Sequence, residues 1–457
     1  MEENTLTDQF VNYLWDFNQR EISEECRKEI QFCLVDYLGA YLAGVKIGKK
    51  NVSSLLQIIS GDGNHKALGV NQPLSLENVA LLQGIVSHYA ELDDGQRIGL
   101  LHPGTVIFSA LLAWHQKFPM NQEVFYKAAL LGYESSIRLA ECVQPSAKIK
   151  GFHGTGLFGT IGAALACATA IQANKQQLKN TLAAACTSAS GILRVIKNTS
   201  QLKPFNSGNA AKNAVSAALM AKAGFEGPID TLDNQLGFLN MYDENFKREK
   251  LLEKTEKPKL FSIYRKPYAA CRHCHPAIDL ALEFRNNHHV QLSDIKKVKI
   301  KTYTLGISGH EHIQIVGVNS AKMSTPYSFA VALFSGKAGL AEFEENYFTQ
   351  PEIVALTNKV TVHAEEYFDT HYPQKRGAEI TVECNNGNQL TLSVDLPKGE
   401  PETKMSELEI ETKFKQLAIF SGISKESTEA IFTECSSDKF TIDVLMMHFS
   451  KLNLINF

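Results

Sequence analysis

The stretch KPYAACRHCHPAID, Lys266–Asp279, separates a mainly helical part of the chain from a part with strand-like patterns. Pro267 and Pro276 fix the backbone φ angle and lack an N–H donor, so we expect an extended or turned chain between them. A helical pattern follows directly. Pro276 near its first turn and Asp279 inside that turn are typical of a helix start.

The same stretch gathers basic and thiol side chains. Arg272, His273 and His275 would lie near the N-terminus of the following helix, where the helix dipole and backbone N–H groups attract anions. Lys266 adds a further positive charge. We therefore expect this segment to form one wall of a pocket for a small polycarboxylate, with the other walls supplied by the rest of the chain.

Composition limits the class of protein. The 457 residues are 44% apolar and 21% charged, which suits a globular protein with two or three domains. A net charge of −3 argues against nucleic-acid binding, which usually needs a basic excess. Nine scattered cysteines predict reduced thiols in the cytoplasm. MEENTLTDQF does not resemble a secretory signal, and we find no run of about 18 apolar residues, so we predict no membrane span.

Hydrophobic spacing predicts two domains of different kinds. Apolar residues at three- and four-residue spacing indicate helices in the N-terminal half and again near the C-terminus. Alternating residues indicate strands at Lys296–Tyr303, Val360–Ala364, Ala378–Cys384 and Gln389–Val394. We predict a mainly α fold, in which residues 1–260 form a helical domain, 405–457 return to it, and 261–400 form an α+β domain.

Three loops in the predicted helical domain each carry polar residues just before a helix. They are SHYAELDDGQRIGLLHPGT (87–105), KIKGFHGTG (148–156) and KPFNSGNAAK (203–212). A long loop in a compact helical region is usually functional or disordered, and the apolar flanks here favour a functional one. Alanine- and glycine-rich helices follow, which we expect to pack closely at the centre of the domain or at a subunit interface.

Histidines occupy equivalent positions in three segments, because His102, His153 and His275 each precede a helix. A lone histidine is more often structural than catalytic. Three in equivalent places favour a site that binds carboxylates, since charged residues accompany them. These charged residues are Asp93, Lys203 and Arg272.

Two further candidates have plain structural alternatives. Asp93 and Asp94 could orient a histidine or take up a proton. A solvated acidic turn is an equally good interpretation, because aspartate is common in turns. Tyr327, in STPYSFAVAL, could be no more than an aromatic residue at a helix start.

Cys271 and Cys274 form a C-x-x-C pair. A zinc site needs four ligands, and these cysteines with their two neighbouring histidines could not easily all reach one ion. A redox role would need a thioredoxin-like βαβ context, which is missing. We therefore predict two small buried thiols and no metal site. We expect other histidines to lie in surface loops, namely His288, His289, His310 and His312.

The ordered motifs resemble the MmgE/PrpD family, which contains 2-methylcitrate dehydratase, cis-aconitate decarboxylase and iminodisuccinate epimerase. The motifs are SHYAELDDG…HPGT, KGFHGTG, KPFNSGNAA and KPYAACRHCHPAID, and the resemblance spans nearly the whole chain. It implies a helical domain built from both chain ends, an inserted α+β lid domain, and a site between them. It also implies a homodimer that works without a metal ion or other cofactor.

The resemblance implies roles for particular residues. Those expected to act in catalysis are Asp93, His102, Lys203, His275 and Tyr327. Those expected to bind substrate are His153 and Arg272, and we add Lys266 and Asp94 as further candidates for substrate binding. As a hypothesis, cations and one histidine bind the carboxylates while His102, His275 or Asp93 moves a proton, and Tyr327 protonates a leaving hydroxyl.

Three places depart from the family pattern. In the acidic loop, Glu91 replaces a common aspartate and Gly95 a common threonine. Asn206 stands where histidine is common, and Gly154 where proline is usual. Our first choice is a hydro-lyase acting on a 2-methylcitrate-like tricarboxylate. Decarboxylation of an aconitate, epimerisation of an amino- or imino-dicarboxylate, and a non-catalytic metabolite- or zinc-binding protein are the alternatives.

Overall fold

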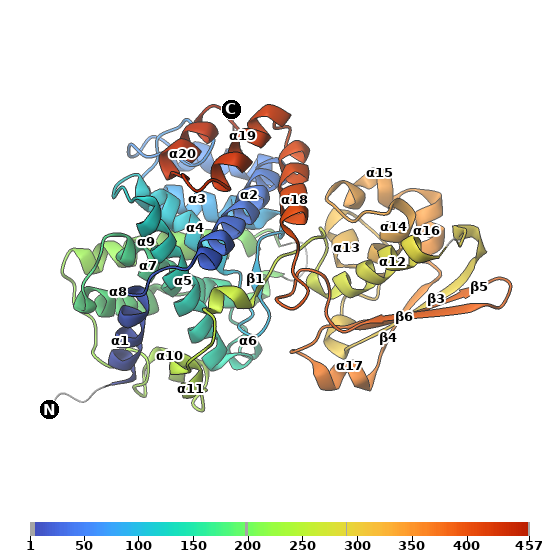
Figure 1. The fold of residues 1–457 in the computed structure, drawn as a ribbon, viewed down its shortest axis with the longest axis horizontal. Helices are drawn as coiled ribbons and strands as arrows, with labels where there is room; N and C mark the ends of the chain where they lie inside the picture. The colour runs from blue at the N-terminus through green and yellow to red at the C-terminus, as the bar shows by residue number, and fades with distance from the viewer. Residues whose placement is uncertain (1–4, 197–199, 289, 456–457) are drawn as a thin grey trace. The chain divides into compact units, whose positions relative to one another are not determined.

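The computed structural model describes residues 5–196, 200–288 and 290–455, and its fold is mainly α, as predicted (Figure 1). The chain divides into two compact units, each described here by itself. Unit 1 contains Met1–Ile263 and Ile410–Phe457, and unit 2 contains Tyr264–Glu409. The sequence had placed the domain boundaries near residues 260 and 400. That the smaller unit acts as a lid stays a prediction.

Unit 1 is a bundle of helices contributed by both chain ends. The helices of its N-terminal part are α1 (Leu6–Asn18), α2 (Glu24–Ile59), α3 (Leu76–Tyr89), α4 (Pro103–His115), α5 (Gln122–Val143), α6 (Ser146–Ile149), α7 (Gly154–Ala170), α8 (Lys175–Ser188), α9 (Lys203–Lys222), α10 (Phe238–Tyr242) and α11 (Arg248–Leu252). Two short strands are β1 (Gly95–Gln96) and β2 (Ile263–Tyr264), the second at the point where the chain leaves the unit.

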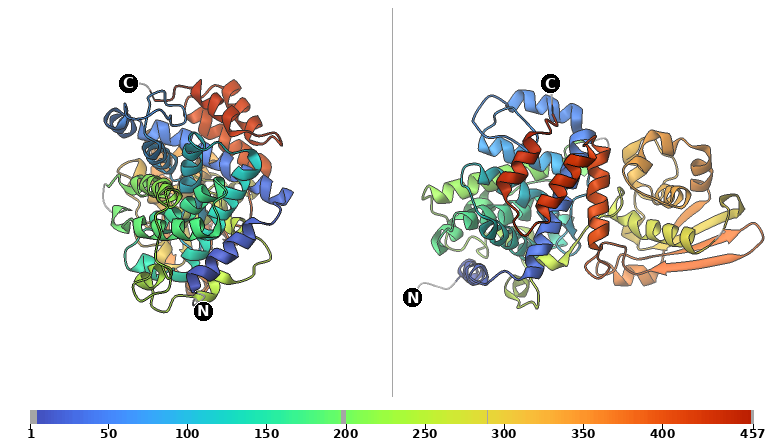
Figure 2. Two further views of the ribbon diagram at one scale, coloured as in Figure 1. Left: turned by 90° about the vertical axis from the view of Figure 1, so that its left-hand side faces the viewer. Right: turned by 45° about the horizontal axis from the view of Figure 1, so that its top comes forward.

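The C-terminal helices pack on the N-terminal part of the chain, as Figures 1 and 2 show. They are α18 (Glu407–Phe420), α19 (Lys425–Cys435) and α20 (Ile442–Ser450). The ring of Phe449 meets the ring of Tyr41 edge-on, with centroids 6.2 Å apart. Helix α19 also packs against α2.

Helix α2 is long and apolar enough to cross a membrane by length and composition. However, 78% of its most apolar window is buried inside the structure, so α2 here is a core helix of unit 1. Inspection of the sequence missed this segment because polar and charged residues, such as Asp36, interrupt its apolar run.

Small residues bring the central helices together, as the alanine- and glycine-rich sequences predicted. Helices α3 and α9 meet at Gly84 and Gly208, where a Cβ on Gly84 would lie 2.8 Å from the Gly208 Cα atom. Helices α5 and α7 meet at Gly132 and Gly162, where a Cβ on Gly162 would lie 2.6 Å from the Gly132 carbonyl oxygen. This close packing fixes the ends of α3, α7 and α9, which carry candidate site residues.

Unit 2 is an α+β unit whose sheet has the strand order β4-β3-β5-β6. The strands are β3 (Ile295–Thr302), β4 (Val360–Ala364), β5 (Ala378–Cys384) and β6 (Gln389–Val394). Strand β3 runs parallel to β4 and antiparallel to β5, with Ile300 opposite Ile380, and β5 and β6 form an antiparallel hairpin. Alternate residues of β5 are buried, which is typical of a sheet covered on one face.

Helices α12 (His275–Asn287) and α14 (Thr325–Ser335) pack on this sheet (Figure 1). Shorter helices complete the unit, namely α13 (Val318–Met323), α15 (Glu345–Phe348), α16 (Pro351–Thr357) and α17 (Glu366–His371).

The KPYAACRHCHPAID stretch is bent between its prolines and ends in a single 3₁₀ turn before α12. Helix α12 starts at His275, before Pro276, so Asp279 lies beyond the first turn, contrary to our prediction. The Asp279 carboxylate accepts hydrogen bonds from the Tyr268 hydroxyl and from the backbone N–H of Lys398. It therefore ties this stretch to a later loop instead of capping a helix.

Candidate functional site

Asp94 anchors the acidic loop to the start of α4. Its carboxylate accepts a hydrogen bond from the Gly104 N–H at 3.0 Å and another from the Tyr133 hydroxyl. A Cβ on Gly104 would lie 2.7 Å from the same carboxylate, so a larger residue there would displace Asp94. Burial raises the pKa of Asp94 to about 7, although both hydrogen bonds act in the opposite direction. Asp94 therefore holds the helix start, and its predicted contact with substrate stays a prediction.

His102 is the residue before α4, and its ring is held in a defined orientation. Its Nδ1 atom lies 2.6 Å from the carbonyl oxygen of Asp94 and 3.5 Å from the carboxylate of Asp93. Because a carbonyl oxygen can only accept, Nδ1 carries the hydrogen and Nε2 holds the lone pair of the neutral ring. The backbone N–H of His102 donates to the Thr155 hydroxyl at 3.0 Å, which ties α4 to α7.

His88, which the sequence analysis did not select, lies beside Asp93 and His102 and completes the group that these residues form. Its Nδ1 atom lies 2.8 Å from the carboxylate of Asp93, and both side chains are buried. Its ring centroid is 4.9 Å from that of His102 and 6.4 Å from that of His153. The signal that could have found it was its place in the same SHYAELDDG motif, in the last turn of α3. The sequence analysis favoured histidines that precede a helix, whereas His88 lies near the end of one.

His153 precedes α7 and is held in the opposite tautomer to His102. The Asn206 amide nitrogen donates to Nδ1 of His153 at 3.1 Å and also to the carbonyl oxygen of Ile192 at 3.3 Å. This carbonyl can only accept, so it identifies the donor end of the amide, and the neutral His153 ring carries its hydrogen on Nε2. Burial, with smaller effects of Lys203 and the neighbouring histidines, lowers the pKa of His153 well below its usual range.

Lys203 opens helix α9 and forms an ion pair with Glu91. The Lys203 side chain is 19% exposed and that of Glu91 is 49% exposed. The pair therefore lies where the group formed by His88, His102 and His153 meets the protein surface. Glu91 adopts a left-handed backbone conformation with φ 56°. A carboxylate beside this lysine is the arrangement that a substrate carboxylate would reproduce.

The C-terminal segment supports the acidic loop. Lys413 of α18 is buried and donates to the carbonyl oxygen of Leu92 at 2.7 Å. Its ammonium also pairs with the buried carboxylate of Asp36 at 2.6 Å. The helix that returns from the chain end therefore fixes the backbone next to Asp93.

Unit 2 holds the remaining predicted residues, and there Arg272 pairs with a residue that the sequence analysis missed. The guanidinium donates through Nη2 and Nε to one carboxylate oxygen of the fully buried Glu400, at 2.7 and 3.2 Å. Its Nη1 donates to Nδ1 of His275 at 2.8 Å, and Nε2 of His275 lies 3.2 Å from the carbonyl oxygen of Ala270. The predicted anion-binding site at the start of α12 is thus occupied by the carboxylate of Glu400, a residue of the same chain.

Tyr327 and Lys266 are both buried. The Tyr327 hydroxyl donates to the carbonyl oxygen of Glu342 at 2.7 Å, an arrangement that fits the plainer interpretation of an aromatic residue at a helix start. Action as an acid would require this hydrogen bond to break. The roles of Arg272, Lys266, His275 and Tyr327 in one shared site with the residues of unit 1 stay predictions.

Two groups in the described part of the chain could hold a metal ion. One consists of His88, Asp93 and His102, in which Nδ1 of His88 lies 2.8 Å from the Asp93 carboxylate and Nδ1 of His102 lies 3.5 Å from it. The other consists of Cys271, His273 and His310.

His310 is buried, so its prediction as a surface-loop residue was wrong, and His289 lies outside the described residues. Cys274 is buried, as expected, and Cys271 is half-buried.

Comparison with known proteins gives consistent matches along the chain. Residues 8–250 match the MmgE/PrpD N-terminal domain, and residues 268–438 match the MmgE/PrpD C-terminal domain. The cis-aconitate decarboxylase-like protein oryM of Aspergillus oryzae is 23% identical, over 97% of this chain and 96% of that protein. The cis-aconitate decarboxylase of Homo sapiens is 23% identical over 90% and 87%. The 2-methylcitrate dehydratase of Salmonella typhimurium is 29% identical over 44% of each chain.

Proposed function

Because the chain belongs to the MmgE/PrpD family, we propose that it is a lyase that acts on a small polycarboxylate. The names of its relatives, decarboxylases and dehydratases of carboxylic acids, support this class of reaction. Within the class, we propose a hydro-lyase that removes water from a 2-methylcitrate-like tricarboxylate. The observation that carries this choice is the pair of opposite histidine tautomers, His102 with a lone pair on Nε2 and His153 with a hydrogen there.

His102 is the proposed base. Dehydration of a hydroxy acid starts with loss of a proton from the carbon beside a carboxylate, and Nε2 of His102 can take up that proton. The ring then becomes a cation, which the carboxylate of Asp93, 3.5 Å from Nδ1, stabilises. The same Nε2 can return the proton to the departing hydroxyl, so that one water leaves and the ring is neutral again.

His153 and Lys203 are the proposed partners of the negative charge. A proton beside a carboxylate is very weakly acidic, so stabilisation of the carbanion or enolate must supply most of the rate. A neutral imidazole with a lowered pKa donates its N–H to a developing oxyanion without surrendering the proton. Lys203 would bind a substrate carboxylate in place of Glu91. All the groups named in this proposed mechanism are side chains of the protein.

Decarboxylation of an aconitate is the second candidate. It is favoured by the relatives named as cis-aconitate decarboxylases, since the similarity to them covers nearly the whole chain. Loss of CO₂ needs cations for the resulting carbanion and a donor that protonates it, but no initial base. The lone pair on Nε2 of His102 therefore supports dehydration more directly. A homodimer and a cytoplasmic location stay predictions.

The test is to incubate the purified full-length chain with a panel of di- and tricarboxylates in heavy water and to follow products by NMR. We expect loss of water from 2-methylcitrate or a close analogue, with turnover insensitive to chelator. Loss of CO₂ from cis-aconitate would support the second candidate instead. Deuterium exchange without loss of either molecule would indicate epimerisation. A lack of reaction across the whole panel would contradict the lyase proposal.

A further inference from the structure

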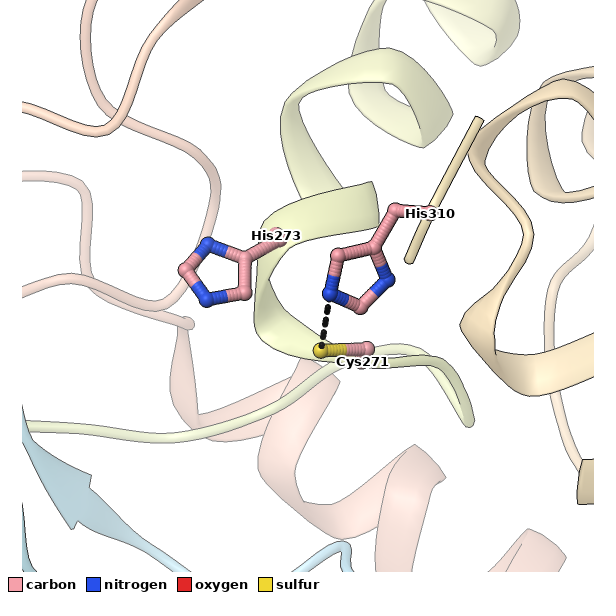
Figure 3. Close-up of side chains that lie close together, drawn as sticks. All are labelled: Cys271, His273 and His310. Carbon is pink, nitrogen blue, oxygen red and sulfur yellow. Dashed lines mark hydrogen bonds between the residues drawn. The ribbon is translucent and has the colours of Figure 1, made fainter. Parts of the chain in front are cut away.

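Cys271, His273 and His310 form a cluster of ligating side chains that the proposed reaction does not use. Each offers one ligand atom, and these atoms all lie within 4.8 Å of one another. Figure 3 shows the Cys271 sulfur and the His310 ring in contact, with His273 beside them. His310 is 39 residues from Cys271 in the sequence, so only the fold brings the three together.

The spacing of the cluster suits a tetrahedral ion. The Sγ atom of Cys271 and the Nε2 atom of His310 are 3.8 Å apart. Zinc holds sulfur at about 2.3 Å and imidazole nitrogen at about 2.0–2.1 Å, which at a tetrahedral angle separates the two ligands by about 3.6 Å. Only a small movement would therefore bring both atoms to bonding distance. Cys271 and His273 are half-buried and His310 is buried, which leaves a route by which an ion can enter.

Hydrogen bonds also prepare the imidazole rings for an ion. Nδ1 of His310 lies 2.7 Å from the carbonyl oxygen of Met323, which can only accept, so Nε2 presents its lone pair to Cys271. Nδ1 of His273 lies 2.6 Å from the hydroxyl of Tyr303. Metal-ligating histidines commonly engage their second nitrogen in this way. Here the Met323 carbonyl fixes the tautomer of His310, and the Tyr303 hydroxyl orients the His273 ring.

We propose that Cys271, His273 and His310 bind a divalent cation of the zinc class, with Cys271 as a thiolate. One sulfur and two imidazole ligands suit zinc, whereas Mg²⁺ and Ca²⁺ prefer oxygen. Binding releases the thiol proton to solvent. The fourth position falls to a water molecule. The ion ties the segment before α12 to the loop that carries His310.

This site differs from the one that the sequence analysis rejected. The rejected site would require both cysteines and the two neighbouring histidines to reach one ion. In the structure, His275 bonds to Arg272 and to the Ala270 carbonyl oxygen. His310 takes its place in the cluster.

The test is the zinc content of the full-length chain, purified after growth with added zinc and dialysed against a weak chelator. We expect about one zinc per wild-type chain and a large loss in Cys271→Ser and in His310→Gln. Cys384→Ser and His312→Gln are matched controls in the same unit that should retain the metal. Tyr303→Phe should weaken zinc binding roughly tenfold, as expected for loss of an outer hydrogen bond.

Two measurements keep the test decisive if a variant folds poorly. Cobalt added to the metal-free wild type should give a thiolate-to-cobalt absorption band that zinc removes, and zinc should protect Cys271 from alkylation, read by mass spectrometry. The proposal is overturned if the wild type retains no more zinc than Cys271→Ser, or if zinc leaves alkylation unchanged. A Cys271–Cys274 disulfide in the protein purified without oxidant would also overturn it. None of these results depends on the proposed lyase activity.

Discussion

His102 donates through Nδ1 to the carbonyl oxygen of Asp94 at 2.6 Å, and this bond decides which ring nitrogen can act as a base. It directs the hydrogen to Nδ1 and leaves the lone pair on Nε2. The Asp93 carboxylate, 3.5 Å from the same Nδ1, stands where it can stabilise the protonated ring. The acidic loop therefore sets the chemistry of His102 through a backbone oxygen and a neighbouring carboxylate.

Replacement of His102 should remove the base. We expect His102→Gln to lower kcat by about 10²–10⁴, the usual contribution of a positioned general base, because an amide cannot take up the proton. Turnover of the substrate identified in the NMR panel is the measurement. His363→Gln, at an exposed position in unit 2, is the control and should keep wild-type rates. Near-normal turnover in His102→Gln would contradict the assignment.

Asp94 should make the stability of the protein depend on pH. Its pKa is about 7 in the folded chain against 3.8 for the unperturbed group, so the folded state holds a proton that the unfolded state releases. This contribution to stability is complete below about pH 4 and is lost as the pH rises through about 7.

Asp94→Asn keeps the shape of the side chain and removes this titration. The free energy of unfolding of the variant, relative to wild type, should rise between pH 4 and pH 7 by an amount on the order of a few kcal/mol. Urea denaturation at several pH values measures it, with the exposed Asp62→Asn as control. Parallel pH curves for Asp94→Asn and wild type would rule out the raised pKa.

Lys413 should be a major source of stability in unit 1. Lys413→Met leaves the carboxylate of Asp36 buried without its cation and removes a donor to Leu92, which should cost about 3–5 kcal/mol. Lys415→Met on the same helix breaks only partly exposed pairs with Glu411 and Glu429 and should cost no more than about 1 kcal/mol. Equal losses of stability in Lys413→Met and Lys415→Met, measured by thermal unfolding, would show that the buried pair contributes no more than the partly exposed pairs.

Glu91 should compete with the substrate for Lys203. An ion pair of this exposure is worth about 0.2–1 kcal/mol, so its removal in Glu91→Gln should lower KM by up to about fivefold with little change in kcat. Lys203→Met should instead raise KM and lower kcat. An increase of KM in Glu91→Gln would show that the carboxylate assists binding.

Local signals in the sequence were sufficient for the helix starts and the hairpin. Ser75 caps α3 through its side chain and Pro103 opens α4, and both residue types are typical of a helix start. Strands β5 and β6, at the ranges that alternating residues predicted, pair across a short turn. Such features depend on a few neighbouring residues, which a single sequence displays.

Tertiary partners were not visible in the sequence. Glu400, which pairs with Arg272, and Lys413, which supports the acidic loop, come from segments far along the chain that carry no motif. His310 looked like a loop residue because its neighbours are polar, yet it is buried beside Cys271. Spacing along the chain indicates which residues can share a helix face, but not which distant side chain will pair with them.

The protonation of His102 and His153 in solution tests most directly whether His102 is the base and His153 the donor. Long-range proton–nitrogen NMR of the histidine-labelled chain, assigned with His102→Gln and His153→Gln, reads the tautomer of each neutral ring. We expect hydrogen on Nδ1 of His102 and on Nε2 of His153. The same tautomer on both rings, or a charged His153 at neutral pH, would contradict this assignment.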